Sequence, residues 1–150
     1  MLIRKSKLED LERIADFNIQ MAEETEGRIL DRDIVLEGVK AVLENKSKGF
    51  YLIAEDNEKG KILTGQLMVT YEWSDWRNKV FWWIQSVYVD KKCRKQRIFS
   101  RLFETISKMA SSQKNVSGLR LYVEKNNNSA KQVYEKLGMK KTAYEIFEKT

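Results

Sequence analysis

Histidine is absent from this sequence of 150 residues, and cysteine occurs once, as Cys93. Without histidine, the usual zinc sites and the histidine-based catalytic triads cannot form, which excludes most hydrolase mechanisms. A single cysteine cannot form an internal disulfide, and no base accompanies Cys93, so we interpret it as incidental to function. We therefore predict neither a metal site nor a covalent enzyme intermediate.

Long apolar runs are missing too. No run approaches the length of a membrane-spanning helix, and the first residues, MLIRKSKLEDLER, contain neither the apolar core nor the cleavage site of a signal peptide. The chain also lacks proline, internal repeats, linkers and low-complexity tracts. Its content of 42% hydrophobic and 33% charged residues is typical of a folded protein. These features predict one cytoplasmic domain over residues 1–150, with no membrane partner.

Positive charge is in excess, with a formal net charge of +6. This favours anionic partners, but the 28 basic residues are spread along the chain and most should be solvated surface. No sequence resembles a known nucleic-acid-reading motif, so we do not expect nucleic acid as a partner. The exception to the even spread is VYVDKKCRKQRIFSRLF, residues 87–103, which crowds cations between a strand-like and a helix-like run.

The first third of the chain predicts a short strand, two helices and a second strand. Ser6 and Glu9 have capping-box spacing, and the apolar positions that follow predict a helix that ends near Gly27. A second helix is predicted to start after Asp31. The SKG sequence after that helix closes the segment before FYLIAED, which is predicted to be a strand.

Two long apolar runs, Ile62–Tyr71 and Val80–Val89, come after a predicted turn over Asp56 to Gly60. They are predicted to be adjacent antiparallel strands. In the second run both alternate sets of side chains are largely apolar, which is typical of a strand at the centre of a sheet. The predicted sets are Val80, Trp82, Ile84 and Tyr88 on one face, and Phe81, Trp83, Val87 and Val89 on the other.

The last third predicts a helix, a strand, a helix and a strand. The run IFSRLFETISKM has one apolar helical face, and a strand, LRLYVEK, follows it. Ser129 and Gln132 have the spacing of a second capping box, for a helix that ends at Gly138, and a last strand is predicted over about residues 140–148. This order of elements predicts an α/β fold with a mixed, mostly antiparallel central sheet flanked by helices.

The basic loop joins the central strand directly to a helix start. No good capping side chain lies closer than Asp90, so several backbone N–H groups should point into the space beyond the end of the strand. Such a nest binds phosphate, and Arg94, Lys95 and Arg97 would add charge-assisted contacts. The alternative is a loop that is simply solvated, and the loop alone does not decide between these interpretations.

The same loop, taken with LYVEKNNNSAKQVYEKLGM, resembles the GNAT family of N-acetyltransferases. That family combines a strand ending in V-x-V with an Arg-x-x-Gly-x-Gly/Ala pyrophosphate loop and a later N-x-x-A-x-x-x-Y-x-x-x-G-F/M pattern. The second pattern is matched by Asn127, Ala130, Tyr134, Gly138 and Met139. The resemblance extends to the order of elements over essentially the whole chain, and it implies a GNAT-like domain that uses acetyl-CoA.

The resemblance also implies a role for individual residues. Backbone groups of the strand ending SVYV would bind the pantetheine arm, the loop would hold the pyrophosphate, and Tyr134 would be the general acid. Tyr134 also lies on the apolar stripe of its predicted helix, so the alternative is a core tyrosine with its hydroxyl at the edge. The chemistry agrees, because a thiolate whose thiol has a pKa of about 8.5 leaves more easily when a donor protonates it. The implied cofactor-binding residues are Val87, Tyr88, Val89, Arg94, Lys95, Gln96, Arg97, Ile98, Phe99, Ser100, Asn127, Ser129 and Tyr134.

Two positions depart from the family pattern, because Arg97 and Phe99 stand where the family loop has small residues. A helix start does not require a positive φ, so non-glycine residues are expected to fit there sterically. What a glycine would supply at these positions is a close approach of the backbone to phosphate. Phe99 is expected to turn inward with the helix stripe, whereas Arg97 either adds a phosphate ligand or obstructs the loop.

The acceptor end needs a group that helps an amine attack as the neutral base. Gln85 and Ser86 are polar in an otherwise apolar strand, and either they are hydrogen-bonded core residues or they order the substrate or a water molecule. We take Gln85 as the second catalytic candidate. Glu23, Glu24 and Glu26 either line the acceptor entrance or are solvated carboxylates at a helix end. Further candidates for the base are Glu72, Asp75 and Glu124.

Aromatic residues are dense in the two central strands and their connection. Most of them should pack the core or a dimer interface, but an acceptor wall or a cation–π contact is a second interpretation for Trp73 or Trp76. The candidate substrate residues are Glu23, Glu26, Trp73 and Trp83. A homodimer through exposed strand edges is one further option.

The hypothesis we favour is an enzyme that moves an acetyl group from acetyl-CoA to a small-molecule or peptide primary amine, by direct attack in a ternary complex. The alternative is a non-catalytic module of the same fold that binds CoA or another anion. The two hypotheses differ in acyl transfer, because a non-catalytic module would bind the cofactor without transferring its acetyl group.

Overall fold

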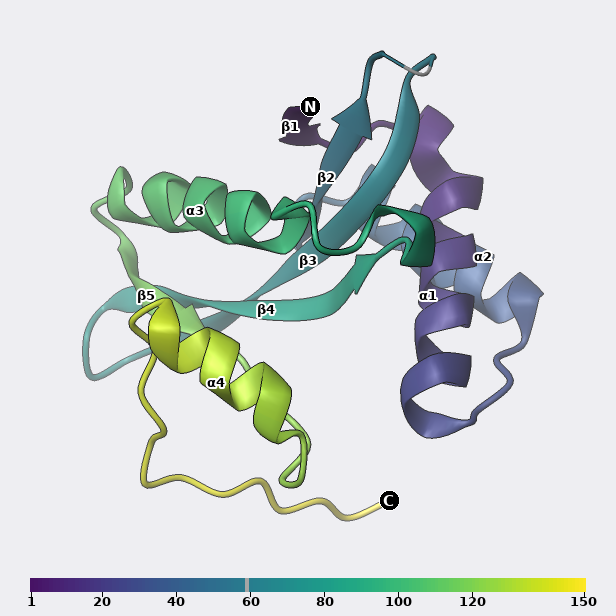
Figure 1. Cartoon of the computed structure of the whole chain (residues 1–150). Coiled ribbons are helices and arrows are strands. Elements are labelled where there is room, and N and C mark those ends of the chain that lie inside the picture. Colours follow the sequence, from purple (N-terminus) through teal and green to yellow (C-terminus); the bar gives the residue numbers. More distant parts are fainter. Residues whose placement is uncertain (59) are drawn as a thin grey trace.

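Five strands form one mixed sheet in the computed structural model, which describes residues 1–58 and 60–150 (Figure 1). The strands are β1 (Leu2–Lys5), β2 (Phe50–Asp56), β3 (Ile62–Ser74), β4 (Lys79–Val89) and β5 (Val116–Arg120). They lie in chain order, with antiparallel pairing from β1 to β4 and parallel pairing of β5 with β4. The predicted mixed, mostly antiparallel α/β sheet is confirmed.

Helices cover both faces of this sheet. They are α1 (Leu11–Glu26), α2 (Arg32–Glu44), α3 (Ile98–Ser111) and α4 (Asn128–Lys136), with short 3-10 helices η1 (Leu8–Asp10) and η2 (Lys91–Cys93). Alternate residues of β2 explain the two layers, because Tyr51 and Ile53 pack with α1 and α2 while Leu52 and Ala54 pack with α3. None of the described helices combines the length and the apolarity needed to cross a bilayer.

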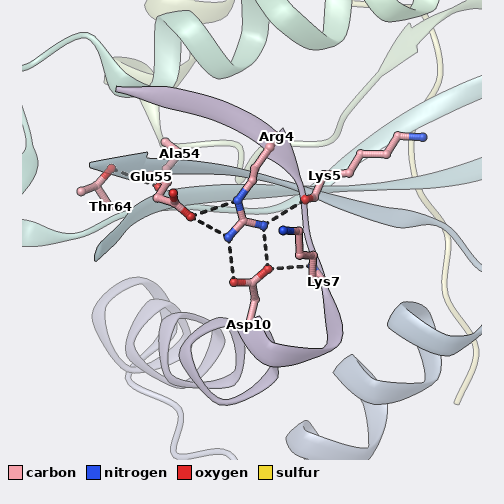
Figure 2. Close-up of polar contacts among 7 residues, drawn as sticks. All are labelled: Arg4, Lys5, Lys7, Asp10, Ala54, Glu55 and Thr64. Carbon is pink, nitrogen blue, oxygen red and sulfur yellow. Dashed lines mark hydrogen bonds and ion pairs between the residues drawn. The ribbon is translucent and has the colours of Figure 1, made fainter. Parts of the chain in front are cut away.

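The start of α1 is held by an ionic cluster, shown in Figure 2, in which Arg4 of β1 lies between Asp10 and Glu55. The backbone N–H of Lys7 also donates to the Asp10 carboxylate, at 2.6 Å. The capping box predicted at Ser6 and Glu9 is therefore wrong by one residue, since Asp10 supplies the carboxylate. Pairing with the half-buried Arg4 explains the shift, because Asp10 satisfies the helix start and Arg4 together.

The connection between α1 and α2 follows the prediction. Gly27 ends α1 with a left-handed φ of 60°, and Asp31 caps α2 by accepting from the N–H groups of Asp33 and Ile34. The turn predicted over Asp56 to Gly60 includes residue 59, which lies outside the described residues.

A β-bulge interrupts β4. Met68 pairs with Gln85 and Gln66 pairs with Tyr88, so β4 has one extra residue between these pairs, and Ser86 has a φ of 50°. An extra residue reverses which face the following side chains point to. Tyr88 accordingly packs with α1 and α2, opposite Trp82 and Ile84, and the predicted grouping of these residues on one face is wrong beyond the bulge.

The carboxyl-terminal predictions need three corrections. β5 spans Val116–Arg120, so the strand predicted over LRLYVEK begins and ends earlier than expected. Asn127, rather than Ser129, caps α4, because its side chain accepts from the N–H of Ala130. The strand predicted over about 140–148 is wrong, since these residues pair with no strand of the described chain and expose Tyr144 and Phe147. Strand-like alternation supplies no hydrogen-bonding partner by itself.

Candidate active site

The far half of β4 lacks a strand on one side. β5 pairs only with Val80–Trp83, so from Ile84 to Val89 the β5 side of β4 has no neighbour in the sheet of the described chain (Figure 1). Backbone N–H and C=O groups on this side can bond to an extended ligand, as a further strand would. We call residues 84–89 the open half of β4. The predicted arm-binding residues Val87, Tyr88 and Val89 lie in it.

The open half of β4 leads into the amino terminus of α3. Gly65 of β3 allows a close approach there, because a Cβ at this position would lie 2.9 Å from Ile98 Cγ2. No side chain of the described residues caps α3, so its first N–H groups are available to an anion. Lys95, Gln96 and Arg97, which precede α3 in the chain, are exposed.

The backbone of this loop is strained. Lys95 has a φ of 64° and Arg97 a φ of 61°, so the expectation that the helix start avoids positive φ is wrong. Left-handed backbone costs an ordinary residue about 1–2 kcal/mol, and the family glycine at this position would relieve it. Ile98 is buried, and Phe99 turns inward against Phe103 as expected, while Ser100 is half-buried.

Glu24 of α1 joins this loop to the helical layer. Its carboxylate accepts from the Tyr88 hydroxyl at 2.7 Å and forms ion pairs with Arg94 at 2.7 Å and Lys91 at 3.3 Å. Desolvation alone would raise the pKa of Glu24, but these donors outweigh it and hold the pKa at about 2. Desolvation and the bond to Glu24 raise the pKa of Tyr88 to about 12.

Arg94 is held in place but is not saturated. Its Nε donates to the Val89 carbonyl at 3.0 Å, and its other hydrogen bond in the described chain is to Glu24. A guanidinium carries five N–H donors, so most of its donors are free to meet a phosphate. Sequence reasoning considered Glu24 only as a residue of the acceptor entrance. Its partners lie about 70 residues away, and no local pattern signals them.

Tyr134 of α4 faces the start of α3. Its ring packs edge-on against Phe99, with 6.0 Å between centroids, and burial raises the pKa of its hydroxyl. Asn127 and Ser129 lie at the start of the same helix, where Asn127 Oδ1 accepts from the Ala130 N–H and the Ser129 hydroxyl. The structure thus brings the predicted acid to the predicted loop.

A polar network that sequence analysis missed lies beneath the bulge. Gln66 of β3 is fully buried, and its Nε2 donates to the Ser86 carbonyl at 3.1 Å and to Asn18 Oδ1 at 2.7 Å. Asn18 in turn donates to the Tyr51 hydroxyl at 3.1 Å. Gln85, the predicted catalytic glutamine, donates instead to Thr70 Oγ1 at 2.5 Å. The bulge is therefore fixed by side chains from α1, β2 and β3.

A groove of about 410 Å³ opens between α1, α2 and the sheet, and Ser86 contributes to its lining. Glu26 lines this groove, whereas Glu23 is exposed and does not. The open half of β4 therefore leads into the loop and the start of α3, where Tyr134 packs on Phe99. The groove lies on the face that carries α1 and α2.

The two tryptophans predicted at the acceptor lie elsewhere. Trp73 is exposed beside a separate hollow of about 350 Å³, which Glu72 and Arg120 also line. Trp83 packs against Tyr122 and donates its Nε1–H to Glu72 at 2.7 Å. Glu72 also pairs with Arg120. The structure does not bring Trp73 or Trp83 into the groove.

Other proteins share this arrangement. The model of the acetyltransferase (GNAT) family matches residues 8–139. A possible acetyltransferase from Clostridium difficile 630 is 44% identical in sequence, with a TM-score of 0.90, and the match covers 99% of this chain and 96% of that chain. The curated proteins contain no significant match.

More distant structures share the fold alone. A probable acetyltransferase has 20% identity and a TM-score of 0.87, covering 100% of this chain and 97% of that one. AAC(6')-Iy, solved with the bisubstrate analog CoA-S-monomethyl-acetylneamine, has 14% identity and a TM-score of 0.77, covering 99% and 97%.

Proposed function

Because the chain belongs to the acetyltransferase (GNAT) family, we propose that it transfers the acetyl group of acetyl-CoA to a primary amine by direct attack in a ternary complex. The observation that carries this proposal is the open half of β4, which runs into the uncapped start of α3 with Tyr134 beside it. An extended, anionic thioester fits this combination of free strand edge, helix amino terminus and proton donor.

The residues present fit the cofactor of the family. Backbone groups of Val87 and Val89 would hold the arm, and the N–H groups at the start of α3 would hold the pyrophosphate with Arg94 and Arg97. Acetyl-CoA would supply a thioester, whose C–S bond would be exchanged for an N–C bond. The amine nitrogen would lose one proton to solvent, and the departing thiolate would gain one from Tyr134, which solvent would then reprotonate.

Tyr134 is the proton donor in this proposal. Burial raises the pKa of the Tyr134 hydroxyl above its ordinary value, so the group stays protonated through neutral pH and a rate limited by this acid should fall only at strongly alkaline pH. Glu24 is unsuited to act as the base, because a carboxylate with a pKa of about 2 accepts a proton poorly at neutral pH. We expect Tyr134→Phe to lower kcat about 100-fold without changing the Kd of acetyl-CoA. Unchanged turnover across the pH range would remove Tyr134 from the mechanism.

The first experiment measures thermal unfolding with acetyl-CoA, with a phosphate-matched nucleotide as control. Ligand at about a hundred times its Kd should stabilise the fold by about 2.7 kcal/mol. The release of CoA thiol is then followed with a panel of primary amines. Binding without transfer to any amine would favour the alternative, a non-catalytic CoA-binding module, and no stabilisation at saturation would reject the cofactor site itself.

A homodimer is a further part of the proposal. β5 is a terminal strand, and Tyr144, Ile146 and Phe147 are exposed on the segment after α4. An unpaired edge and an unpaired apolar segment on one chain can satisfy each other across a twofold axis. Sedimentation equilibrium tests this, since a monomer at micromolar concentration would contradict it.

A further inference from the structure

The walls of the groove between α1 and α2 are mainly apolar. They consist of Met21 and Ala22 from α1, Val35, Val39 and Val42 from α2, and Met68 from β3. One polar part of the lining, here called the floor, consists of Asn18, Tyr51 and Ser86. Asn18 donates to the Tyr51 hydroxyl, and Gln66 donates to both Asn18 and the Ser86 carbonyl. The groove thus combines one polar end, next to the bulge of β4, with a long apolar side.

Charge in the groove is sparse and balanced. The charged residues that line it are Glu26 and Arg28, and neither forms an ion pair with another described residue. A substrate with several ammonium groups needs several carboxylates, and one carboxylate beside an arginine does not supply them. The formal net charge of +6 further opposes the approach of a polycation.

We propose that the acceptor is a small primary monoamine with an apolar aliphatic or aromatic body. The inference rests on the proposed acetyl transfer and names the substrate class of that site. The amine lies at the floor beside Ser86, and the body lies against the valines of α2. Apolar contact along α2 provides affinity, and the absence of a carboxylate cluster provides selection against polyamines.

Gly38 offers a way to test this inference without disturbing the fold. It lies in α2 and lines the groove, and a Cβ built on it meets no atom within 4 Å. Its φ is not positive, so larger residues fit its backbone. Glycine is a poor helix former, and either alanine or leucine at this position should favour α2. Leucine adds a side chain that extends into the groove, whereas alanine adds one methyl group.

The experiment compares the chain with its Gly38→Leu and Gly38→Ala variants. The acceptors are hexylamine, 2-phenylethylamine, ethanolamine and spermidine, assayed by thiol release and by the mass of the acetylated product. We expect kcat/KM for the two apolar amines to exceed that for ethanolamine and spermidine at least tenfold. Gly38→Leu should lower kcat/KM for the apolar amines about tenfold or more, mainly through KM, while Gly38→Ala changes it less than threefold.

A thermal-shift measurement of acetyl-CoA binding separates this inference from the proposed function. If all three chains bind acetyl-CoA but spermidine or ethanolamine is the better acceptor, the inference is overturned and acetyl transfer stands. If acetyl-CoA binds and no apolar amine is acetylated, the inference is overturned as well. An unchanged KM in Gly38→Leu, with normal folding, would show that the apolar body does not lie in this groove. A chain that binds no acetyl-CoA overturns the proposed function instead.

Discussion

The two ends of α1 carry arginine–carboxylate clusters of contrasting character. At the amino-terminal end, Arg4 donates to Asp10, to Glu55 and to the Lys5 carbonyl, and these bonds use all five of its N–H donors. Its side chain is 18% exposed, and both carboxylates are 7% exposed. The pKa of Arg4 is raised, mainly by its hydrogen bond to Asp10, against the opposing effect of desolvation.

At the carboxyl-terminal end, Arg94 is 44% exposed and Lys91 is 67% exposed, while their partner Glu24 is 21% exposed. Arg94 keeps donors free, and it lies next to the open half of β4. The comparison shows that the same pair of chemical groups serves two purposes. A saturated, buried cluster fixes the fold, whereas an unsaturated, exposed cluster can hold an arginine ready for an anion.

The largest effect is expected from breaking the buried cluster. Arg4→Met leaves two buried carboxylates without a cation, which should lower the free energy of unfolding by about 3–5 kcal/mol. Urea denaturation at neutral pH measures this loss. The folded fraction should still bind acetyl-CoA with an unchanged Kd, because none of the hydrogen bonds of Arg4 involves the loop. A loss below about 1 kcal/mol would mean that the two clusters do not differ as described.

Removing the charge of Glu24 should affect binding more than stability. Glu24→Gln releases Arg94, and we expect the Kd of acetyl-CoA to rise about tenfold, with a stability loss of only about 1 kcal/mol for exposed ion pairs. Isothermal titration measures the Kd. Glu104→Gln is the matched control, since this exposed glutamate of α3 forms no ion pair with any described residue. Equal effects of the two variants would contradict a positioning role for Glu24.

The same variant has a defined pH signature. The pKa of Glu24 is lowered from 4.5 in the unfolded chain to about 2 in the folded state, so its charge stabilises the fold above about pH 4.5. This contribution disappears as the pH falls from about 4.5 to 2. The difference in stability between the native chain and Glu24→Gln should therefore shrink across this range in urea titrations. A difference that stays constant would show that the carboxylate is not held by these cations.

Substitutions of Arg97 should give the smallest effects, and Arg97→Gly should raise stability while it weakens acetyl-CoA binding. Arg97→Gly relieves the left-handed strain and should stabilise the fold by up to about 1 kcal/mol, while Arg97→Ala keeps the strain. Both remove a cation from the loop, so both should weaken acetyl-CoA binding about threefold to tenfold and reduce its salt dependence. Tighter binding by Arg97→Gly alone would mean that Arg97 obstructs the loop.

Local chemistry explains which features could be predicted from the sequence. The end of α1 at Gly27 and the start of α2 after Asp31 could be predicted. Helix capping and a left-handed glycine depend only on residues that are close in the sequence. The loop from Arg94 to Ser100 could be located because its strand, cations and helix are contiguous. Features that join distant segments could not be predicted, among them Glu24 with Arg94 and Gln66 with Ser86.

The bulge at Ser86 is the clearest case of such a failure. Both alternate sets of β4 are apolar, so the sequence pattern looks the same whether or not a residue is inserted. For the same reason the apolar pattern predicted a final strand over about 140–148 although the segment has no partner. Hydrophobic alternation reports a preference for extended structure, and it does not report register or pairing.

The extra residue in β4 also has a genetic consequence. A bulge bends its strand and increases the local twist, and β4 loses β5 as a neighbour just before it reaches Ser86. Deleting one codon here would restore plain alternation and favour a sheet that pairs along its full length. A single in-frame deletion or insertion could therefore close or open this half of β4, which is a far smaller evolutionary step than replacing the surrounding side chains one at a time.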